Sequence, residues 1–549
     1  MTFLFVLQYP GYLRYFDSTI RLLADRGHKV LLSFDSPHKQ PEGIEALNDA
    51  SSNIRVIGKT AGRHDVWALV AKAVRGTIDY ARYLHPDFAD APYLRNRMRS
   101  ALPRGMAFLG RRTTMSERAT TRLIRALGVL ERAIPSGVAL DLWVSAFNPD
   151  AVVVSPLVTD QCSQVDLIKT ARALGTRSAL CVASWDHLTT KGLMRIQPDL
   201  VALWNEQQRA EALAYHAARP DSIVVTGAQP FDRWFDRQPS TDRLQFCEKV
   251  GLRADQPVVL FVGSTASISA PDAELHFVRR WAAAVRSVCG HDVGILIRPH
   301  PYNSAHWGQA DLAGMSNAAV FPTHQANPVD QDDRADYFDS LYHSAVVVGV
   351  NTSAMIEAAI VGRPVHAILA PEFAETQGGT LHFRYLLPEN GGFLRVATGL
   401  DEHAHQLAAT LAEPDRDREA LSRFVGWFVR PNGLGTPATP VIVSALEGVA
   451  AKGRTRPTGV PLYLYPLRFV MWAVACVVYF RGLNQTQLSI RRSVKLHRRF
   501  WTQRWGLWIH RRRSRFSRDW AKRMKRLRSR ADRLTGRSGR ASTPRPPEA

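Results

Sequence analysis

The chain has 549 residues and a formal net charge of +22, a length that supports two sizeable hydrophobic cores and excludes a single small domain. The charge is uneven: residues 451–549 hold 26 Lys and Arg against three Asp and Glu, whereas residues 1–450 hold 45 basic and 46 acidic residues. The five cysteines form no CxxC pair and no metal-ligand spacing, which is typical of buried thiols in a reducing compartment.

Residues 1–231 predict a first α/β domain. Phe3–Leu7 is expected to be a buried strand rather than a signal peptide, Leu13–Arg26 a helix that ends at Gly27, and Lys29–Phe34 the next strand. Later apolar runs, several of them separated by helical stretches, predict further short strands at 152–155, 178–183, 200–204 and 223–226. This alternation favours a mainly parallel sheet wrapped by helices.

Residues from about 67 to 140 do not follow this alternation. Their pattern is helical, and they carry a run of basic residues: Arg95, Arg97, Arg99, Arg104, Arg111 and Arg112. We interpret this segment as a helical insertion in the first domain. A polar stretch at 232–252 then separates the two halves of the body.

A second α/β domain is predicted for residues 251–445. The expected strands lie at 258–262, 294–297, 319–321, 345–350 and 365–369. Two open α/β sheets joined by a linker place a cleft between them, and ligands of such sheets bind beyond the carboxyl ends of the strands. The predicted fold class is therefore α/β, with two Rossmann-like domains that face a cleft.

Residues 459–540 carry the excess charge and predict a tail that associates with membranes. An apolar run at 461–480 has the length of a membrane span but is interrupted by Pro466 and Arg468. Beyond it, Arg and Lys alternate with aromatic residues in a helical pattern: Trp501, Trp505, Trp508, Phe516 and Trp520. This pattern favours a helix that lies on an anionic bilayer, with a true span or a nucleic-acid-binding arm as alternatives. Residues 541–549 are expected to be disordered.

The segment VVVGVNTSAMIEAAIVGRPV, residues 346–365, combines an apolar strand, a small polar turn and an Ala-rich helix. Backbone N–H groups at a helix N-terminus favour a phosphate, and small residues such as Asn351, Thr352 and Ser353 let it approach. Glu357, one turn further on, could reach a ribose hydroxyl. An ordinary strand-to-helix turn is the alternative interpretation.

A second motif, ILIRPHPY at 295–302, ends a strand with Arg298 and His300. It lies shortly before the turn at 351–353 and is expected on the same sheet edge. Two elements that favour phosphate therefore converge at the predicted cleft. A simple loop is the alternative for an isolated His-Pro pair.

The second half resembles the nucleotide-binding domain of GT-B-type glycosyltransferases. Within that group it is most similar to CDP-glycerol glycerophosphotransferase-like enzymes and related surface-polysaccharide transferases. The matching motifs are RPHP at 298–301 and GVNTSAMIEAAIVGRP at 349–364, with further likeness in YPGYLRYFDS and in VTGAQPFD at 225–232. The resemblance covers roughly residues 1–445.

This resemblance implies the donor-binding residues. His300 would contact the donor diphosphate or nucleotide, Thr352 and Ser353 phosphate oxygens, and Glu357 the ribose. The loop Gly263-Ser264-Thr265 resembles the one that approaches the phosphate in this fold, so Ser264 and Thr265 join Arg298 and Asn351 as expected donor-binding residues. Glycerophosphotransferases usually show Asp-Tyr-Ser-Ser where this chain has Val350-Asn351-Thr352-Ser353, a departure that favours sugar transfer over glycerol phosphate transfer.

Transfer to a hydroxyl needs a group that takes up a proton, and two carboxylates of the first domain are candidates. Asp17 lies near the head of a predicted helix, where an N-cap is the alternative role. Asp186 lies in SWDHLTTKG, just past a predicted strand, beside Trp185, His187 and Lys191. We interpret Asp186 as a base or acceptor-binding residue and its three neighbours as acceptor-side residues.

No obligatory metal and no cofactor are predicted. Asp330, Asp332 and Asp333 are expected in a solvated polar loop rather than at a metal site. Helix dipoles, Arg298 and Arg363 are expected to offset the donor phosphates. A Gly-rich loop with Gly378, Gly379, Thr380, His382 and Arg384 could close over the donor.

The predicted function is a membrane-associated glycosyltransferase on the cytoplasmic face of the cell membrane. It would transfer a sugar from a nucleotide-sugar donor to a lipid-linked or cell-surface polysaccharide acceptor. A CDP-glycerol-type glycerophosphotransferase, which would take a CDP-polyol donor, is the alternative on the same fold. A UDP-sugar 2-epimerase-like enzyme would have no use for the tail. A non-catalytic nucleic-acid-binding protein is disfavoured and would show steeply salt-dependent binding.

Overall fold

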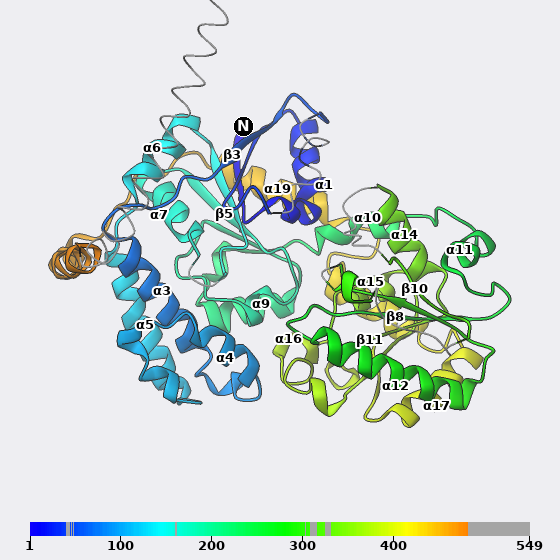
Figure 1. The fold of residues 1–549 in the computed structure, drawn as a ribbon. Coiled ribbons are helices and arrows are strands. Elements are labelled where there is room, and N and C mark those ends of the chain that lie inside the picture. The colour runs from blue at the N-terminus through cyan, green and yellow to red at the C-terminus, as the bar shows by residue number, and fades with distance from the viewer. Residues whose placement is uncertain are drawn as a thin grey trace, which may run out of the picture. The chain divides into compact units, whose positions relative to one another are not determined.

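A computed structural model describes residues 1–39, 44, 47, 49–159, 162–301, 303–307, 316–323 and 331–480. Residues 1–473 form one compact unit, and residues 474–549 are grouped as a second one. The first unit contains two parallel β-sheets covered by helices (Figure 1). The predicted α/β class with two Rossmann-like sheets is confirmed.

The first sheet has seven strands in the order β3-β2-β1-β4-β5-β6-β7, all parallel to their neighbours. The strands are β1 (Thr2–Leu7), β2 (Lys29–Phe34), β3 (Ile54–Lys59), β4 (Ala151–Ser155), β5 (Arg177–Cys181), β6 (Leu200–Leu203) and β7 (Ile223–Val225). Leu4 in the central strand pairs with Leu31 on one side and Val152 on the other. These strands are nearly continuous apolar runs because helices cover both faces.

Helices α1 (Leu13–Asp25), α7 (Gln164–Leu174), α8 (His187–Thr190) and α9 (Glu206–His216) belong to this domain. Helix α1 buries Phe16, Ile20 and Leu23 against the sheet, at the spacing of one helix face. Gly27 follows α1 with a φ of 80°, a left-handed conformation that glycine adopts without strain. The chain is thereby redirected into β2.

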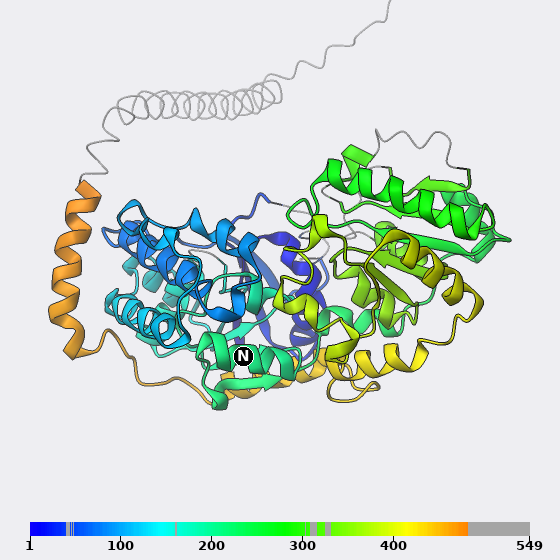
Figure 2. The same cartoon turned by 90° about the horizontal axis from the view of Figure 1, so that it is seen from below.

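The segment between β3 and β4 is helical: α3 (Ala68–Arg82), α4 (Pro92–Arg99), α5 (Glu117–Ala133) and α6 (Val138–Phe147). Helices α3 and α5 lie on the side away from the second domain, whereas α4 reaches toward it (Figures 1 and 2). Buried ion pairs join α3 and α5 to α7: Arg75 lies 3.0 Å from Glu131 and 2.7 Å from Asp166. These helices are therefore fixed to the first domain by charge as well as by packing.

The second sheet has six parallel strands in the order β10-β9-β8-β11-β12-β13. They are β8 (Val258–Val262), β9 (Gly294–Arg298), β10 (Ala318–Val320), β11 (Val346–Gly349), β12 (Val365–Ile368) and β13 (Arg395–Ala397). The helices of this half are α11 (Arg243–Val250), α12 (Pro271–Cys289), α13 (Ser304–Trp307), α14 (Gln331–Tyr342), α15 (Ala354–Ile360), α16 (Leu381–Arg384), α17 (Leu400–Ala412) and α18 (Arg418–Phe424).

Helix α19 (Ala438–Ala451) returns to the first domain, so the predicted end of the second domain at 445 falls inside a helix of the first. Its side chains Ile442, Val443 and Leu446 are buried in the core of the first sheet beside α1 (Figure 1). The sequence shows an apolar helix but not which of two sheets it covers. That choice depends on tertiary packing.

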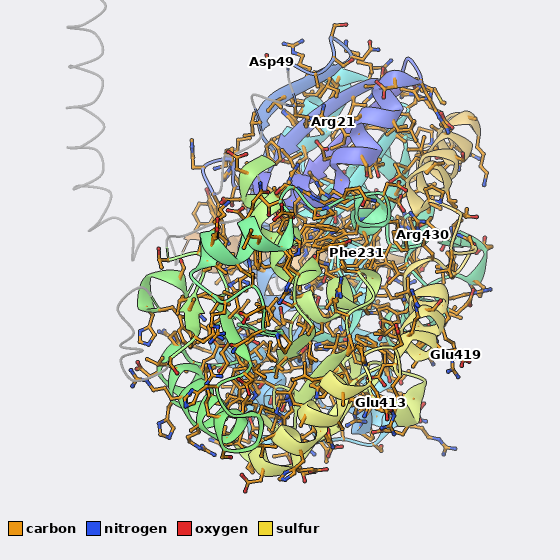
Figure 3. All side chains as sticks on the ribbon, turned by 90° about the vertical axis from the view of Figure 1, so that its right-hand side faces the viewer. Arg21, Asp49, Phe231, Glu413, Glu419 and Arg430 are labelled. Carbon is orange, nitrogen blue, oxygen red and sulfur yellow. The ribbon has the colours of Figure 1, made fainter. Side chains whose placement is uncertain are left out.

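The chain passes from the first domain to the second and later returns to the first. Both connections meet at Asp232, the first residue of α10 (Asp232–Phe235). Its carboxylate accepts hydrogen bonds from the N–H groups of Ala438 at 2.9 Å and Thr439 at 2.6 Å, and pairs with Arg430 at 3.3 Å. Arg430 and Phe231 lie at this junction (Figure 3). One carboxylate thus holds the outgoing and the returning segment together.

Among the described residues, one helix is long and apolar enough to cross a membrane by length and composition, Leu462–Phe480. The predicted interruption at Pro466 does not break it, because the proline lies in the first turn, where its missing N–H costs no hydrogen bond. The basic part of the predicted tail, from residue 481 onward, lies outside the described residues.

Two buried histidines, His366 of strand β12 and His403 of helix α17, pack against each other in the second domain. The rings of His366 and His403 are 5.3 Å apart, and both side chains are fully buried. His366 Nε2 lies 3.1 Å from Thr410 Oγ1, and Trp281 Nε1–H donates to His403 Nδ1 at 3.3 Å. Burial lowers the pKa of His403 to about 4, and burial together with His403 lowers that of His366. Both imidazoles are therefore neutral at pH 7.

We expect the free energy of unfolding to fall as the pH drops from about 6.5 to about 4. The unfolded chain binds protons at these histidines in that range, whereas the folded protein does not. The contribution of the two histidines to the free energy of unfolding is therefore complete above the range and is lost below it. His403 alone accounts for up to about 3 kcal/mol at pH 4. Urea unfolding at pH 7, 5.5 and 4.5 measures this loss, and His403→Gln should make it smaller. An equal loss in both proteins would contradict the assignment.

Candidate active site

A cavity of about 480 Å³ lies between the two sheets, within the size range of small-molecule sites. The first domain contributes residues of the loop after β1, of α4 and of the segment 184–191. The second domain contributes the loops after β8, β9 and β11. The carboxyl ends of the strands of both sheets therefore point at the same space.

The loop after β8 approaches the loop after β9 at Gly263. Its N–H donates to Arg298 O at 2.8 Å, and a Cβ at this position would lie 2.8 Å from His300 N. Only glycine permits this approach without moving the backbone. Thr265 lines the cavity, but Ser264 is fully buried outside it, with its N–H bound to Glu274 Oε1 at 2.8 Å. Ser264 therefore supports the loop from outside the cavity lining, and its donor contact remains a prediction.

Arg298 lines the cavity. Its guanidinium donates to Ser340 Oγ at 3.0 Å and lies 4.9 Å from the centre of the Tyr337 ring. Burial lowers its pKa to about 10, although Tyr337 and the carboxylates Asp336, Asp333 and Glu357 oppose the fall. The guanidinium therefore stays protonated at neutral pH.

Glu357 lies beside Arg298 and accepts a hydrogen bond from the Tyr337 hydroxyl. Burial raises its pKa to about 7, although the Tyr337 hydrogen bond and the arginines Arg14, Arg233 and Arg298 oppose the rise. The side chain is therefore half protonated at neutral pH. In either state it can accept a hydrogen bond from a sugar hydroxyl.

His300 lines the cavity at the end of β9. Burial, and next the positive charge of Arg14, lower its pKa to about 4. The imidazole is neutral at pH 7 and offers an N–H to an anionic oxygen without adding a charge.

The turn after β11 contributes Asn351, Thr352 and Ser353 to the cavity. Asn351 Nδ2 donates to Thr376 O at 2.6 Å, so this side chain holds the loop that follows β12. Ser353 Oγ accepts a hydrogen bond from Trp185 Nε1 at 3.1 Å. That contact joins the second domain to the predicted acceptor side of the first.

The Gly-rich loop lies against the insertion. Thr380 and His382 line the cavity, and the His382 ring lies 4.7 Å from the Trp185 ring. A Cβ on Gly379 would lie 2.4 Å from Asp90 O, so this contact between the domains requires glycine. Arg384 pairs with Asp90 at 3.1 Å instead of lining the cavity.

Asp186 and His187 begin the short helix α8 on the first-domain wall. Burial alone would raise the pKa of Asp186, but His187, Lys191 and His382 hold it well below its usual range. Ser184 Oγ and Thr190 Oγ1 donate to its two oxygens at 2.5 and 2.8 Å. Asp186 is thus a permanently ionised carboxylate and a weak base. Burial lowers the pKa of His187 to about 4 against the opposing effect of Asp186.

The insertion holds the segment that carries these residues. The Arg82 guanidinium, which is almost fully buried, donates to the carbonyl oxygens of Leu188, Lys191 and Gly192. Tyr83 and Arg97 donate to the carbonyls of Lys191 and Thr190. Side chains from α3 and α4 thereby fix the backbone at 188–192.

Three predicted site residues lie elsewhere. Asp17 is in the second turn of α1, paired with Arg21 at 3.0 Å, and is neither an N-cap nor part of the cavity lining. Arg363 follows α15 and lies over the Tyr342 ring at 5.2 Å, outside the lining. Asp332 and Asp333 are in the first turn of α14 rather than in a loop; Asp330 lies outside the described residues.

The cavity lining holds cations that the sequence analysis did not assign to the site: Arg14, Arg97, Arg233, Arg237 and Arg334. Of these, Arg97 was noted only as part of the basic run in the insertion. With Lys191 and Arg298 they make seven cations, against the two carboxylates Asp186 and Glu357. Arg14 lies in the YPGYLRYFDS motif and could have been noticed there. The others have no local signal, because only the fold brings them together. The cavity therefore favours a ligand with several negative charges.

Within the described ranges, no group of three or more His, Cys, Asp or Glu residues is placed to hold a metal ion. Independence from metals remains a prediction.

No protein-family model matches the chain, and no curated protein matches it. Solved structures with a similar fold include a glycosyltransferase from Rickettsia africae (11% identity, 82% of this chain and 98% of that chain, TM-score 0.46). The UDP-GlcNAc 2-epimerase of Methanocaldococcus jannaschii is another (12% identity, 82% of this chain and 100% of that chain, TM-score 0.47). A third is WaaG, a glycosyltransferase involved in lipopolysaccharide biosynthesis (12% identity, 82% of this chain and 99% of that chain, TM-score 0.43). At this level of likeness, the functional argument rests on the chain's own residues.

We expect Arg82→Lys to loosen the segment 187–193 without unfolding the protein. A lysine has one ammonium group and cannot donate to three separate carbonyl oxygens as the guanidinium fork does. Amide hydrogen exchange in this segment should become at least about tenfold faster, since one tenfold step needs only about 1.4 kcal/mol of lost local stability. Arg118→Lys, an exposed change in helix α5 of the same insertion, is the matched control. Unchanged exchange in Arg82→Lys would show that the insertion does not fix the segment.

Proposed function

We propose that this protein is a glycosyltransferase of GT-B type that moves a sugar from a nucleotide-sugar donor to an acceptor hydroxyl. One observation carries the proposal. A wall of the second domain that carries Arg298, His300 and Glu357 faces Asp186 and His187 of the first domain across a single cavity. A donor and an acceptor can meet only in such a two-sided site.

The second-domain wall suits a nucleoside diphosphate. Arg298 and the neutral His300 would donate to phosphate oxygens, with the hydroxyls of Thr352 and Ser353 beside them. Glu357 would accept a hydrogen bond from a ribose hydroxyl. These groups also stabilise the diphosphate that leaves, where negative charge grows during the reaction.

The chemical step needs a proton acceptor on the opposite wall. The acceptor oxygen bonds to the anomeric carbon, the bond from that carbon to the phosphate oxygen breaks, and the diphosphate leaves with the electron pair. The neutral imidazole of His187 takes the hydroxyl proton, and the ionised Asp186 stabilises the imidazolium that forms. Asp186 then acts through its charge, rather than as the base that the sequence suggested.

The acceptor wall carries three tyrosines after β1 that can pack against sugar rings. Tyr9 and Tyr12 have ring centroids 4.9 Å apart, and Tyr12 and Tyr15 5.5 Å apart; all three line the cavity. Aromatic faces bury the apolar side of a sugar while their hydroxyls bond to its edge. Polysaccharide or lipid-linked sugars are the acceptors that this wall and an anchored enzyme suit.

The C-terminal region supports membrane association. The helix Leu462–Phe480 is apolar, and the residues after it add a strongly positive charge. Such a combination binds an anionic bilayer surface, and nucleotide-sugar donors are cytosolic. We therefore place the enzyme at the cytoplasmic face of the membrane.

We expect His300→Ala to weaken nucleoside diphosphate binding by about tenfold, because one hydrogen bond to a charged oxygen is lost. A thermal-shift screen with UDP, CDP, GDP and ADP first identifies the nucleotide, since a ligand of the folded state raises the melting temperature. Titration calorimetry then compares wild type, His300→Ala and the remote control His291→Ala. Unchanged affinity in His300→Ala would reject the donor site. The enzyme is then incubated with the matching nucleotide-sugar and, separately, with CDP-glycerol. A product from the nucleotide-sugar supports sugar transfer, and a product from CDP-glycerol supports glycerol phosphate transfer.

We expect removal of residues 459–549 to release the protein from membranes with donor binding intact. The deleted segment contains the apolar helix and 23 of the 71 Lys and Arg residues. Sedimentation with anionic and neutral liposomes at low and high salt measures the release. In the full chain, Val474→Asp with Val478→Asp tests the apolar helix separately, and Leu244→Asp on an exposed site is the control. Continued pelleting of the shortened protein would place the anchor elsewhere.

A further inference from the structure

The segment that follows α19 is bound to the first domain through its backbone. We call residues 453–458 the tether. Thr455 N–H donates to Gly175 O at 2.8 Å, and Thr458 N–H donates to Arg172 O at 2.9 Å. A Cβ on Gly175 would lie 2.3 Å from Thr455 O, so this close contact requires glycine. The tether therefore leaves the first domain beside the end of α7.

The tether determines where the apolar helix Leu462–Phe480 can begin. Leu462 follows Thr458 by four positions, and an extended chain of that length spans at most about 14 Å. Helix α6 packs against α7 (Figure 1), and the tether is bound to its end as well, because Arg454 Nη2 donates to Asn148 Oδ1 at 2.5 Å. A bilayer that holds the start of the apolar helix therefore lies close to α6 and α7.

Helix α6 presents an apolar face to solvent at this place. Leu140 and Val144 are buried on its inner side, whereas Val138 is 71% exposed and Leu142 is 67% exposed. Among the described residues before 462, these two are the most exposed large apolar side chains. They lie four positions apart, so they share one face of the helix. Apolar side chains gathered on one exposed face indicate an interaction surface.

The charge around this face is mainly positive. The one charged residue of α6, Asp141, accepts hydrogen bonds from Ser136 Oγ at 2.9 Å and from Thr170 Oγ1 at 2.6 Å, so it is turned toward the body of the domain. Asp150 is exposed at the start of β4, and Asp199 pairs with Arg177 at 3.6 Å. Four exposed cations lie at the end of α5 and in or just before the tether: Arg132, Lys452, Arg454 and Arg456.

We propose that the outer face of α6 is a second membrane contact, which places Val138 and Leu142 in the interfacial layer of an anionic bilayer beside the anchor. The inference rests on the proposed membrane association and adds the surface that faces the lipid. Amphipathic helices with cations at their edges lie in that layer with the apolar side buried. A single attachment point lets the first domain rotate over the bilayer, whereas two attachment points determine which side of it faces the lipid.

The test uses the full-length protein with one fluorescent probe on α6. Leu142→Cys is labelled with the environment-sensitive dye NBD in a protein that also carries Cys289→Ser and Cys476→Ser; the other three cysteines are buried. The protein is bound to vesicles of phosphatidylcholine and phosphatidylglycerol, with and without brominated acyl chains that quench the dye. We expect the probe at 142 to be quenched at least about threefold more than the same probe at 244, because an interfacial helix lies about 5–10 Å into the headgroup boundary.

Leu244→Cys is the matched control, because Leu244 is 58% exposed in α11 of the second domain. Val138→Asp should lower the quenching at 142 by about half at an equal bound fraction, because it buries a charge on the same face. Equal quenching at 142 and 244 in protein that sediments with vesicles would overturn the α6 contact alone. Failure of the full-length protein to sediment with vesicles would overturn the membrane association as well. A blue shift at 142 that grows with protein concentration without lipid would assign the face to a second copy of the chain and overturn the lipid contact.

Discussion

Positive charge gathered in the cavity is the feature on which the rest of the site depends. Seven cations face two carboxylates there, and like charges in a partly buried space repel strongly. Aromatic rings and a backbone carbonyl hold three of these cations: Arg298 lies over Tyr337, Arg237 over Phe338, and Arg97 donates to Thr190 O. An anionic ligand would reduce the repulsion among the seven.

The histidines of the cavity complement this charge because they carry none of their own at pH 7. Burial lowers the pKa of His187, His300 and His382 to about 4 in each case. A neutral imidazole can donate or take up a proton, whereas an arginine cannot. The site thus separates two tasks. Arginines supply the field for an anionic substrate, and imidazoles on facing walls supply hydrogen bonds and proton transfer.

The sequence predicted the parts of the fold that local pattern determines. Buried strands such as Phe3–Leu7 are continuous apolar runs, and the turns after β9 and β11 carry polar residues that the structure brings to one cavity. It missed β3 and β13, which are edge strands with partly exposed side chains. Asp17 and Ser264 lie outside the cavity lining, because sequence position does not say which way a side chain points. Arg233 and Arg334 could not be paired from sequence, since their meeting depends on how two domains face each other.

The same carboxylate that joins the domains also limits how they can move. Asp232 bonds to the start of α19 and to Arg430, so the outgoing and returning segments are held at one point. The domains also meet at the cavity, where Trp185 Nε1 donates to Ser353 Oγ and Arg384 pairs with Asp90. A change in the angle between the sheets would break these two contacts, and it would alter the distance between His187 and the donor.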